Sequence, residues 1–290
     1  MSFDANAHRE ASLQNWEEAA PGWVRRQELL RELGAPVSSW MLDALALAPG
    51  QRVLELAAGL GETGMLAAER VAPTGGVIIS DQAEAMLEGA RARAGALGLS
   101  NVEFQVLNAE WIDLPVASID GVLCRWGYML MADPAVALGE TRRVLRPGGR
   151  LALAVWDSIE HNPWALLPAQ ELSERGLGAE QEGEAPDPAQ APPGPFALGN
   201  SARVSQLLAE AGFGEVEVQS MELPRRHGSF QELWETTLDL SRNFHDAVLD
   251  RPAPEIAEIE AGLAERFAPY TATDGTLEVP GRTLLASAEA

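Results

Sequence analysis

The pattern of apolar and polar positions changes twice along the chain. Before residue 50, apolar residues recur at helical spacing over 16–33 and again over 40–47, which predicts two helices. From 51 to 156, short apolar runs alternate with stretches of helical length. Beyond residue 156 the alternation becomes irregular, so the most regular part of the fold is expected to end there.

The middle segment predicts a parallel α/β sheet. Strand signals fall at 52–57, 76–81, 102–107, 119–124 and 150–156, and helix signals fall between them at 63–71, 83–97 and 134–145. Such alternation is typical of right-handed βαβ units with parallel strands. The apolar runs 77–79 and 151–155 are typical of strands buried on both faces. The segment therefore predicts an open, doubly wound, Rossmann-like sheet.

The rest of the chain predicts additions to this core. Residues 176–200 are rich in Pro, Gly and Glu, which indicates a surface loop or lid edge. A sixth strand is expected at 216–219, helices at 230–249 and 254–267, and a last strand at 276–288 that Pro280 interrupts. We expect an N-terminal helical cap (1–50), a ligand-binding core (51–156), and a lid loop, helical insertion and final strands of the same domain (157–290).

Charge and composition narrow the partners. The formal net charge is -22, which repels phosphate backbones and anionic lipid, so neither nucleic acid nor a membrane is expected as a partner. Every cationic side chain is Arg, which excludes lysine chemistry. The single cysteine, Cys124, excludes an intrachain disulfide, and no metal site is predicted. No signal peptide and no spanning apolar run are recognised, so a cytoplasmic location is expected.

A glycine loop follows the first predicted strand. Gly59, Gly61 and Gly64 precede a helix whose N-terminal N–H groups can face a ligand. Their spacing matches the dinucleotide fingerprint, but S-adenosylmethionine also fits such a loop. Glu55 at the strand end favours S-adenosylmethionine, because a carboxylate can receive its ammonium and is poorly placed beside a pyrophosphate. A turn without ligand, in which Glu55 orients the loop, is the alternative.

Polar residues also follow the later strands. Asp81 can accept hydrogen bonds from ribose hydroxyls, or it can cap the next helix. Asn108 suits the edge of adenine, or it can shape its own loop. Arg125, Trp126 and the residues after them should face the ligand, since open α/β sheets bind ligands at the carboxyl ends of their strands. Plain core packing is the alternative for the aromatic residues and Met there.

Five ordered motifs resemble the class I S-adenosylmethionine-dependent methyltransferases, and most of all their type 11 group, which is similar to ubiquinone/menaquinone-biosynthesis C-methyltransferases. The motifs are 55–61, 81–87, 108–115, 119–122 and 143–151. The resemblance implies a seven-stranded sheet whose last strand is antiparallel, and S-adenosylmethionine as cofactor. Two positions depart from the family pattern: Ala57 stands where Gly is usual, and Asn108 where Asp is usual.

The resemblance also implies roles for individual residues. It places Glu55, Ala57, Gly59 and Gly61 around the methionine moiety and Asp81 on the ribose. The remaining implied cofactor contacts are Gln82, Met86, Asn108, Ala109, Glu110 and Arg125. Methyl transfer from a sulfonium is an in-line displacement that chiefly needs alignment and exclusion of water.

The acceptor side is less well defined by the sequence. Where the nucleophile needs a base, His161 and then Tyr128 are the candidates, although a surface position is the alternative for His161. Substrate contacts are expected from Trp23, Trp126, Met129 and Trp164. The acidic composition and the aromatic residues favour a neutral or cationic, partly apolar methyl acceptor, such as a small phenolic, polyketide-like or quinone-like compound.

Two other functions fit the same residues. One is an NAD-dependent oxidoreductase that uses the glycine fingerprint with Asp81. The other is a non-catalytic protein that binds S-adenosylmethionine, since no catalytic residue stands out. The N-terminal helices can cover the site within one chain or pair with a second copy, so a homodimer is one expected assembly.

Overall fold

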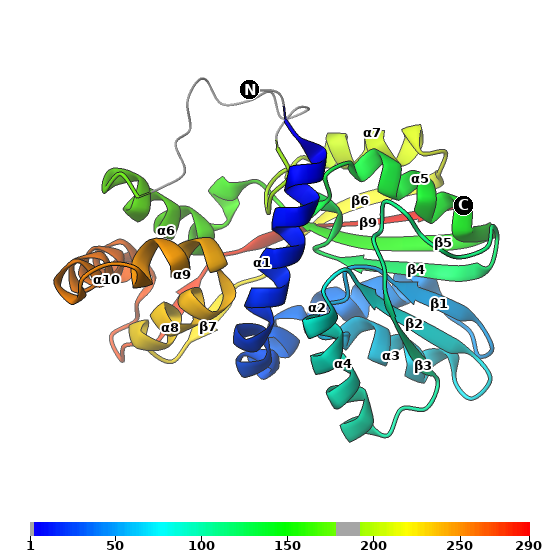
Figure 1. Cartoon of the computed structure of the whole chain (residues 1–290), viewed down its shortest axis with the longest axis horizontal. Coiled ribbons are helices and arrows are strands. Elements are labelled where there is room, and N and C mark those ends of the chain that lie inside the picture. Colours follow the sequence, from blue (N-terminus) through cyan, green and yellow to red (C-terminus); the bar gives the residue numbers. More distant parts are fainter. Residues whose placement is uncertain (1–2, 178–191) are drawn as a thin grey trace.

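A mixed seven-stranded sheet flanked by helices forms the larger part of the molecule (Figure 1). The computed structural model describes residues 3–177 and 192–290. The α-helices are α1 (Ala5–Arg25), α2 (Gln27–Leu45), α3 (Glu62–Val71), α4 (Glu84–Leu97), α5 (Pro134–Val144), α6 (Pro163–Glu174), α7 (Ser201–Glu210), α8 (Phe230–Leu240), α9 (Arg242–Leu249) and α10 (Ala253–Phe267). The strands are β1 (Arg52–Glu55), β2 (Gly76–Asp81), β3 (Val102–Val106), β4 (Ile119–Arg125), β5 (Leu145–Trp156), β6 (Gly214–Glu222), β7 (Arg225–His227), β8 (Leu277–Val279) and β9 (Arg282–Glu289).

The order of the strands confirms the predicted fold class. The sheet runs β3-β2-β1-β4-β5-β9-β6, and β9 is antiparallel to both of its neighbours. Chain order reverses between β1 and β4, so the helices that follow these two strands leave the sheet in opposite directions. A crevice is expected outside the carboxyl ends of the strands at this point.

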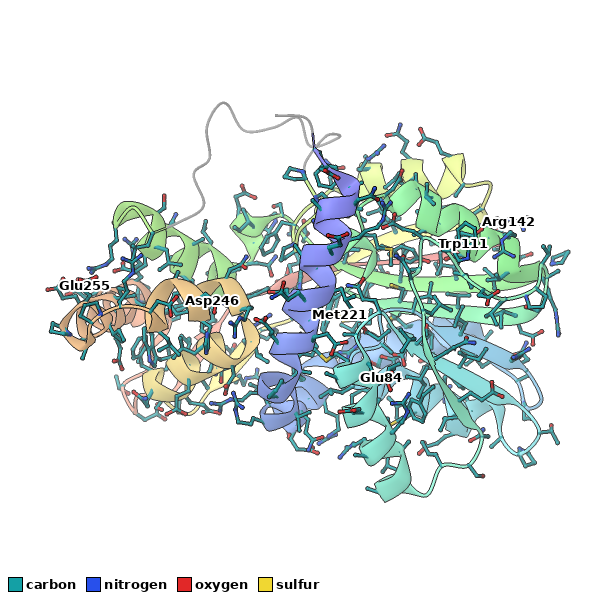
Figure 2. All side chains as sticks on the ribbon, viewed as in Figure 1. Glu84, Trp111, Arg142, Met221, Asp246 and Glu255 are labelled. Carbon is teal, nitrogen blue, oxygen red and sulfur yellow. The ribbon has the colours of Figure 1, made fainter. Side chains whose placement is uncertain are left out.

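The burial of the central strands explains why the apolar runs of residues 51–156 predicted them correctly. Val53 and Leu54 of β1 are fully buried between β2 and β4, and the apolar run of β5 is buried along its whole second half. Parallel strands covered on both faces carry continuous apolar runs. Acidic side chains on the outer helices are exposed, as Glu84, Asp246 and Glu255 show on α4, α9 and α10 (Figure 2).

The N-terminal helices differ from the predicted boundaries of 16–33 and 40–47. Helix α1 begins earlier, at an N-cap formed by Asp4, whose side chain accepts from the backbone N–H groups of Asn6 and Ala7. It ends at Arg25, and the single residue Arg26 separates it from α2. The apolar periodicity continues through this break, so the sequence pattern did not reveal where one helix ends and the next begins. In Figure 1, α1 crosses the molecule between the sheet and the helices α8 and α9.

A second group of elements has a core of its own. Helices α6, α8, α9 and α10 and the small sheet of β7 and β8 pack around side chains that include Val248, Leu263 and Phe267, all fully buried. The predicted last strand at 276–288 is divided at Pro280: β8 pairs with β7 outside the main sheet, and β9 enters the main sheet. Of the predicted loop at 176–200, residues 178–191 lie outside the described residues. None of the described helices is long and apolar enough to cross a membrane.

Candidate functional site

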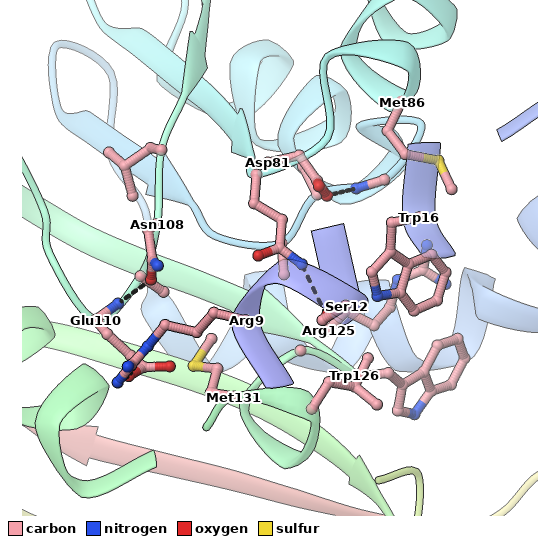
Figure 3. A pocket seen from close by; sticks show the side chains of 18 of the residues that line it. Arg9, Ser12, Trp16, Asp81, Met86, Asn108, Glu110, Arg125, Trp126 and Met131 are labelled. Atoms are coloured by element: carbon pink, nitrogen blue, oxygen red, sulfur yellow. Dashed lines mark hydrogen bonds and ion pairs between the residues drawn. The ribbon is translucent and has the colours of Figure 1, made fainter. Parts of the chain in front are cut away.

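A cavity opens at the carboxyl ends of β1, β2, β3 and β4, and α1 closes it from the opposite side (Figure 3). It encloses about 980 Å3 of space, the open mouth included. The lining residues are His8, Arg9, Ser12, Trp16, Trp23, Leu30, Ala57, Ala58, Gly59, Asp81, Gln82, Met86, Leu107, Asn108, Ala109, Glu110, Arg125, Trp126, Gly127, Leu130, Met131 and Ala132.

The loop after β1 takes a conformation that favours small residues. Gly59 and Gly61 have φ angles of 54° and 74°, in the left-handed region. A Cβ at Gly61 would also lie 3.1 Å from Ile79 Cγ2, so this glycine serves packing against β2 and is not part of the lining. Ala57 has a φ of 48°, and it is therefore the departure from the family pattern that costs backbone strain.

Asp81 joins the end of β2 to this loop. Its Oδ2 accepts from the N–H of Gly59 at 2.8 Å, and its Oδ1 accepts from the N–H of Ala83 at 3.0 Å. Burial raises the pKa of the Asp81 carboxyl, and these backbone donors oppose that shift. The carboxylate lines the cavity while holding both segments in place. The helix-cap alternative for Asp81 is wrong, because the N-cap of α4 is Ala83 and the N–H groups of Glu84 and Ala85 in its first turn donate to Glu17.

Glu55 lies beneath the loop, outside the lining of the cavity. Its side chain is buried at 2% exposure, and Oε2 has no hydrogen-bond partner in the described part of the chain. Burial raises the pKa of Glu55 to about 8, and the positive charge of Arg125 opposes the rise. A Cβ on Gly64 would lie 2.3 Å from Oε2, so the third glycine leaves room for this carboxylate. The geometry fits the loop-orienting role of Glu55.

Arg125 brings positive charge to the cavity wall at the end of β4. The guanidinium forms no ion pair or hydrogen bond with a described residue. Its Cζ lies 4.8 Å from the ring centre of Trp126. A Cβ on Gly34 would lie 1.7 Å from Arg125 Nη1, so α2 approaches the guanidinium closely. Burial lowers the pKa of Arg125, while Glu55 and Glu62 raise it. A cation without a partner at a cavity wall is suited to bind an anionic group.

The segment after β3 forms the opposite wall. Asn108 Oδ1 accepts from the N–H of Glu110 at 2.8 Å, which shapes the loop and leaves the amide NH2 group free of this bond. Glu110 accepts from Arg9 Nε at 3.1 Å and from the N–H of Ala132 at 3.0 Å. Glu110 therefore connects α1 to this wall, and Ala109 completes the lining beside it.

Helix α1 supplies polar contacts that the sequence did not predict, beside Trp16 and Trp23, which it indicated as aromatic pocket residues or as plain helix packing. Ser12 accepts from Gln82 Nε2 at 3.0 Å, and His8 Nε2 lies 3.0 Å from the carbonyl oxygen of Leu130. Trp16 packs edge-on against Trp23 at 5.2 Å. The cap formed by Asp4 was the available signal, because it marks a helix start ahead of the first apolar repeat.

The predicted acceptor residues separate into two groups. Trp23 and Trp126 line the cavity, whereas Met129 and Trp164 do not. Met129 is buried, and its sulfur accepts from the N–H of Trp156 at 3.4 Å. Trp164 packs edge-on against Trp156 at 4.9 Å, beyond Trp126.

Neither predicted base lines the cavity. Tyr128 is fully buried, its hydroxyl lies 2.6 Å from Thr141 Oγ1, and burial holds its pKa well above the usual range. His161 is partly exposed and lies against Arg282, with Ser158 Oγ 3.0 Å from Nδ1. Both positions fit structural roles. Within 3–177 and 192–290, no group of three or more His, Cys, Asp or Glu side chains is arranged to hold a metal ion.

Comparison with known proteins adds independent information. A family model described as a methyltransferase domain matches residues 47–211, more than half of the chain. Nocamycin O-methyltransferase from Saccharothrix syringae is 31% identical over 264 residues, which cover 87% of this chain and 92% of that protein. Demethylmenaquinone methyltransferase from Deinococcus radiodurans is 42% identical over 111 residues, which cover 38% of this chain and 45% of that protein.

The coverage of relatives is uneven. The chain spans less than half the length of the Deinococcus protein. It is also 38% identical to an uncharacterised 37.1 kDa protein from Streptomyces fradiae over 163 residues, which cover 54% of this chain and 47% of that protein. Among solved structures, the YcgJ protein of Bacillus subtilis superimposes with a TM-score of 0.56 at 20% identity, covering 87% of this chain and 97% of that one. This likeness supports the fold.

Proposed function

The chain belongs to the S-adenosylmethionine-dependent methyltransferases, and we propose that its acceptor is a small molecule that reaches the cavity at the ends of β1 to β4. The observation that supports the proposal is that Asp81 and Arg125, which can bind opposite charges or hydroxyl groups of a ligand, both line the same cavity. The membership disfavours the NAD-dependent oxidoreductase that glycine spacing alone had left open.

The polar groups of the cavity fit the parts of S-adenosylmethionine. Asp81 would hold the ribose hydroxyls, because its carboxylate lines the cavity and can accept further hydrogen bonds. Asn108 would face the adenine edge with its amide NH2 group. Arg125 would bind the carboxylate of the methionine moiety, since its guanidinium has no other anion among the described residues. Glu55 lies beneath the loop and would influence the charge of Arg125, and so the binding of the methionine moiety.

Alignment and exclusion of water are the tasks left to the protein. When bound, the cofactor supplies an electrophilic methyl group on a sulfonium. Helix α1 covers the cavity with Trp16 and Trp23, which keeps water from the reacting atoms. The ring of Trp126, at the end of β4, would form the boundary between cofactor and acceptor. An O-methyltransferase among the relatives with near-full coverage supports a small oxygen acceptor.

Transfer of radioactive methyl from S-adenosylmethionine tests the proposal. The protein is incubated with phenols, hydroquinones and amines, and methylated products are separated and counted. We expect label on at least one phenolic or hydroquinone acceptor. Binding of cofactor without transfer to any acceptor would favour the non-catalytic alternative. The variant Asp43→Asn, on the exposed outer side of α2, is a control that should retain transfer.

A further inference from the structure

A stack of aromatic and cationic side chains leads away from the cavity. Trp126, which lines the cavity, stacks on Trp156 with ring centres 4.4 Å apart and planes 11° apart. Trp156 meets Trp164 edge-on at 4.9 Å. The guanidinium of Arg225 lies 3.3 Å from the ring centre of Trp164 and 5.2 Å from that of Trp156. The stack therefore links the cavity at the end of β4 to β7 of the insertion.

The indole rings of this stack are held in fixed orientations. Trp126 Nε1 donates to Thr283 Oγ1 at 3.1 Å. Trp164 Nε1 donates to Oδ1 of the fully buried Asn162 at 2.8 Å. Asn162 in turn donates through Nδ2 to three backbone carbonyl groups, including those of Asp157 and Arg282. The orientations of the indole rings are thus fixed before any ligand binds, and Trp126 is the ring of the stack that lines the cavity.

Arg225 carries a charge that no anion balances in the described part of the chain. Its Nε is buried and has no hydrogen-bond partner there, and no ion pair with Arg225 is formed. Burial lowers the pKa of Arg225 to about 9, still above neutral pH, so the side chain stays charged. By contrast, the next residue, Arg226, is exposed and pairs with Glu278 at 2.8 Å.

Two further buried polar atoms belong to His227 of β7 and Thr236 of α8. His227 Nδ1 and Thr236 Oγ1 are buried and form no hydrogen bond with described residues. Burial lowers the pKa of His227 to about 4, and the charge of Arg225 acts in the same direction, so His227 is neutral at pH 7. A buried polar group without a partner usually marks a bound water or ligand. Arg225 is the charged member of this group and determines which ligand it favours.

We propose that Arg225 is a specificity-determining residue that binds an anionic oxygen, carboxylate or enolate, of a planar acceptor lying along the Trp126–Trp156–Trp164 stack. This inference rests on the proposed function, because it identifies the acceptor of that same reaction as an acid. Arg suits the role since its planar guanidinium stacks on an indole and still presents N–H donors to an oxygen anion. The net charge of -22 repels anions from most of the surface, so binding of an anionic acceptor depends on this local cation.

Calorimetric titration with a matched pair of probes tests the proposal. The full chain is first saturated with S-adenosylhomocysteine and then titrated with 1-naphthoate or with 1-naphthamide, which share a planar ring system and differ in charge. We expect 1-naphthoate to bind at least about tenfold more tightly, the size of one charge-assisted hydrogen bond. The variant Arg225→Gln should bring the ratio close to one, whereas Arg226→Gln should leave it unchanged.

The controls separate the two proposals. Absence of S-adenosylhomocysteine binding by the wild-type protein would contradict the proposed function. Binding of the cofactor product together with an equal or absent response to the two probes would overturn only the role of Arg225. A naphthoate preference that persists in Arg225→Gln would overturn it too. Should that variant not fold, Arg225→Lys, which keeps the charge without the planar stack, should lower the ratio relative to the wild-type protein, and an unchanged ratio would contradict the inference.

Discussion

The two sides of the aromatic stack differ in how their polar groups are satisfied. On the cofactor side, Asp81 and Glu110 accept backbone N–H groups and also line the cavity. On the insertion side, Arg225, His227 and Thr236 have buried polar atoms without described partners. The two carboxylates that line the cofactor side are therefore held in place by the fold itself. Glu55 Oε2 beneath the loop and the Arg125 guanidinium have no described partner, so they resemble the polar atoms of the insertion side in this respect.

This difference agrees with the division of the core. The sheet and its helices form one apolar cluster, and α6, α8, α9 and α10 with β7 and β8 form another. A shared cofactor needs a constant site, whereas acceptors differ from one enzyme to the next. Separate cores let the insertion change without disturbing the cofactor side.

The largest expected effect comes from breaking the core of the insertion. Phe267 is fully buried there, so Phe267→Ala should lower the free energy of unfolding by about 3–5 kcal/mol in urea denaturation. Affinity for S-adenosylhomocysteine, measured by calorimetry, should stay within about twofold where the folded state persists. The matched variant Leu151→Ala, in β5 of the main sheet, should lower both quantities. A folded Phe267→Ala protein that cannot bind the cofactor product would contradict the independence of the two cores.

The next effect concerns the cofactor side. Asp81→Asn keeps one acceptor oxygen but removes the charge that would bind ribose hydroxyls, so S-adenosylhomocysteine should bind about 100-fold more weakly. Asp43→Asn, an exposed carboxylate on α2, serves as the control and should bind normally. Equal affinity of the wild-type protein and Asp81→Asn would remove Asp81 from the site.

The pH dependence of stability reports on Glu55. Because its pKa rises to about 8 in the folded state from 4.5, the folded chain holds a proton that the unfolded chain releases between these two values. The free energy of unfolding should therefore fall as pH rises through this window. Between about pH 6 and about pH 9, we expect the wild-type protein to lose about 3 kcal/mol more than Glu55→Gln, as measured by urea denaturation. The exposed Glu84→Gln should follow the wild-type curve, and a Glu55→Gln curve of the same slope would argue against a protonated Glu55.

The smallest effect concerns the attachment of α1. Arg9 pairs with Glu110 across the mouth of the cavity, and the pair is partly exposed, which limits its strength to about 1 kcal/mol. Arg9→Gln should weaken S-adenosylhomocysteine binding about two- to fivefold by calorimetry. Arg31→Gln, which breaks an exposed pair with Glu28 on α2, should have no effect. An unchanged affinity in Arg9→Gln would mean that α1 covers the cavity without this contact.

The sequence predicted the regular part of the fold because local signals determine it. The apolar runs of β1, β2, β4 and β5 and the glycine loop are short-range patterns, and the structure confirms the doubly wound sheet that they implied. The break at Arg26 and the three-residue strand β7 were not predicted, and β8 was predicted only as part of one last strand. A break inside a continuous apolar period leaves no mark, and so short a strand carries too little pattern to detect.

Site residues that lie in the short motifs after the predicted strands could be predicted from the sequence, whereas residues brought in from distant parts of the chain could not. Of the predicted cofactor residues, Ala57, Asp81 and Arg125 are among those that the structure brings into one cavity, while Glu55 and Gly61 lie beneath it. Arg225 gave no signal, because its indole partner Trp164 is remote in sequence and the lack of an anion is a property of the folded chain. His161 and Tyr128 were chosen by residue type, and their surroundings in the fold assign them to other contacts.

A crystal structure of the protein with S-adenosylhomocysteine would show directly whether the cavity at the ends of β1 to β4 holds the cofactor. We expect the ribose hydroxyls within hydrogen-bond distance of the Asp81 carboxylate, the amino-acid carboxylate at Arg125, and the sulfur facing Trp126. A nucleoside bound away from Asp81, or a cavity left empty at saturating ligand, would contradict this expectation.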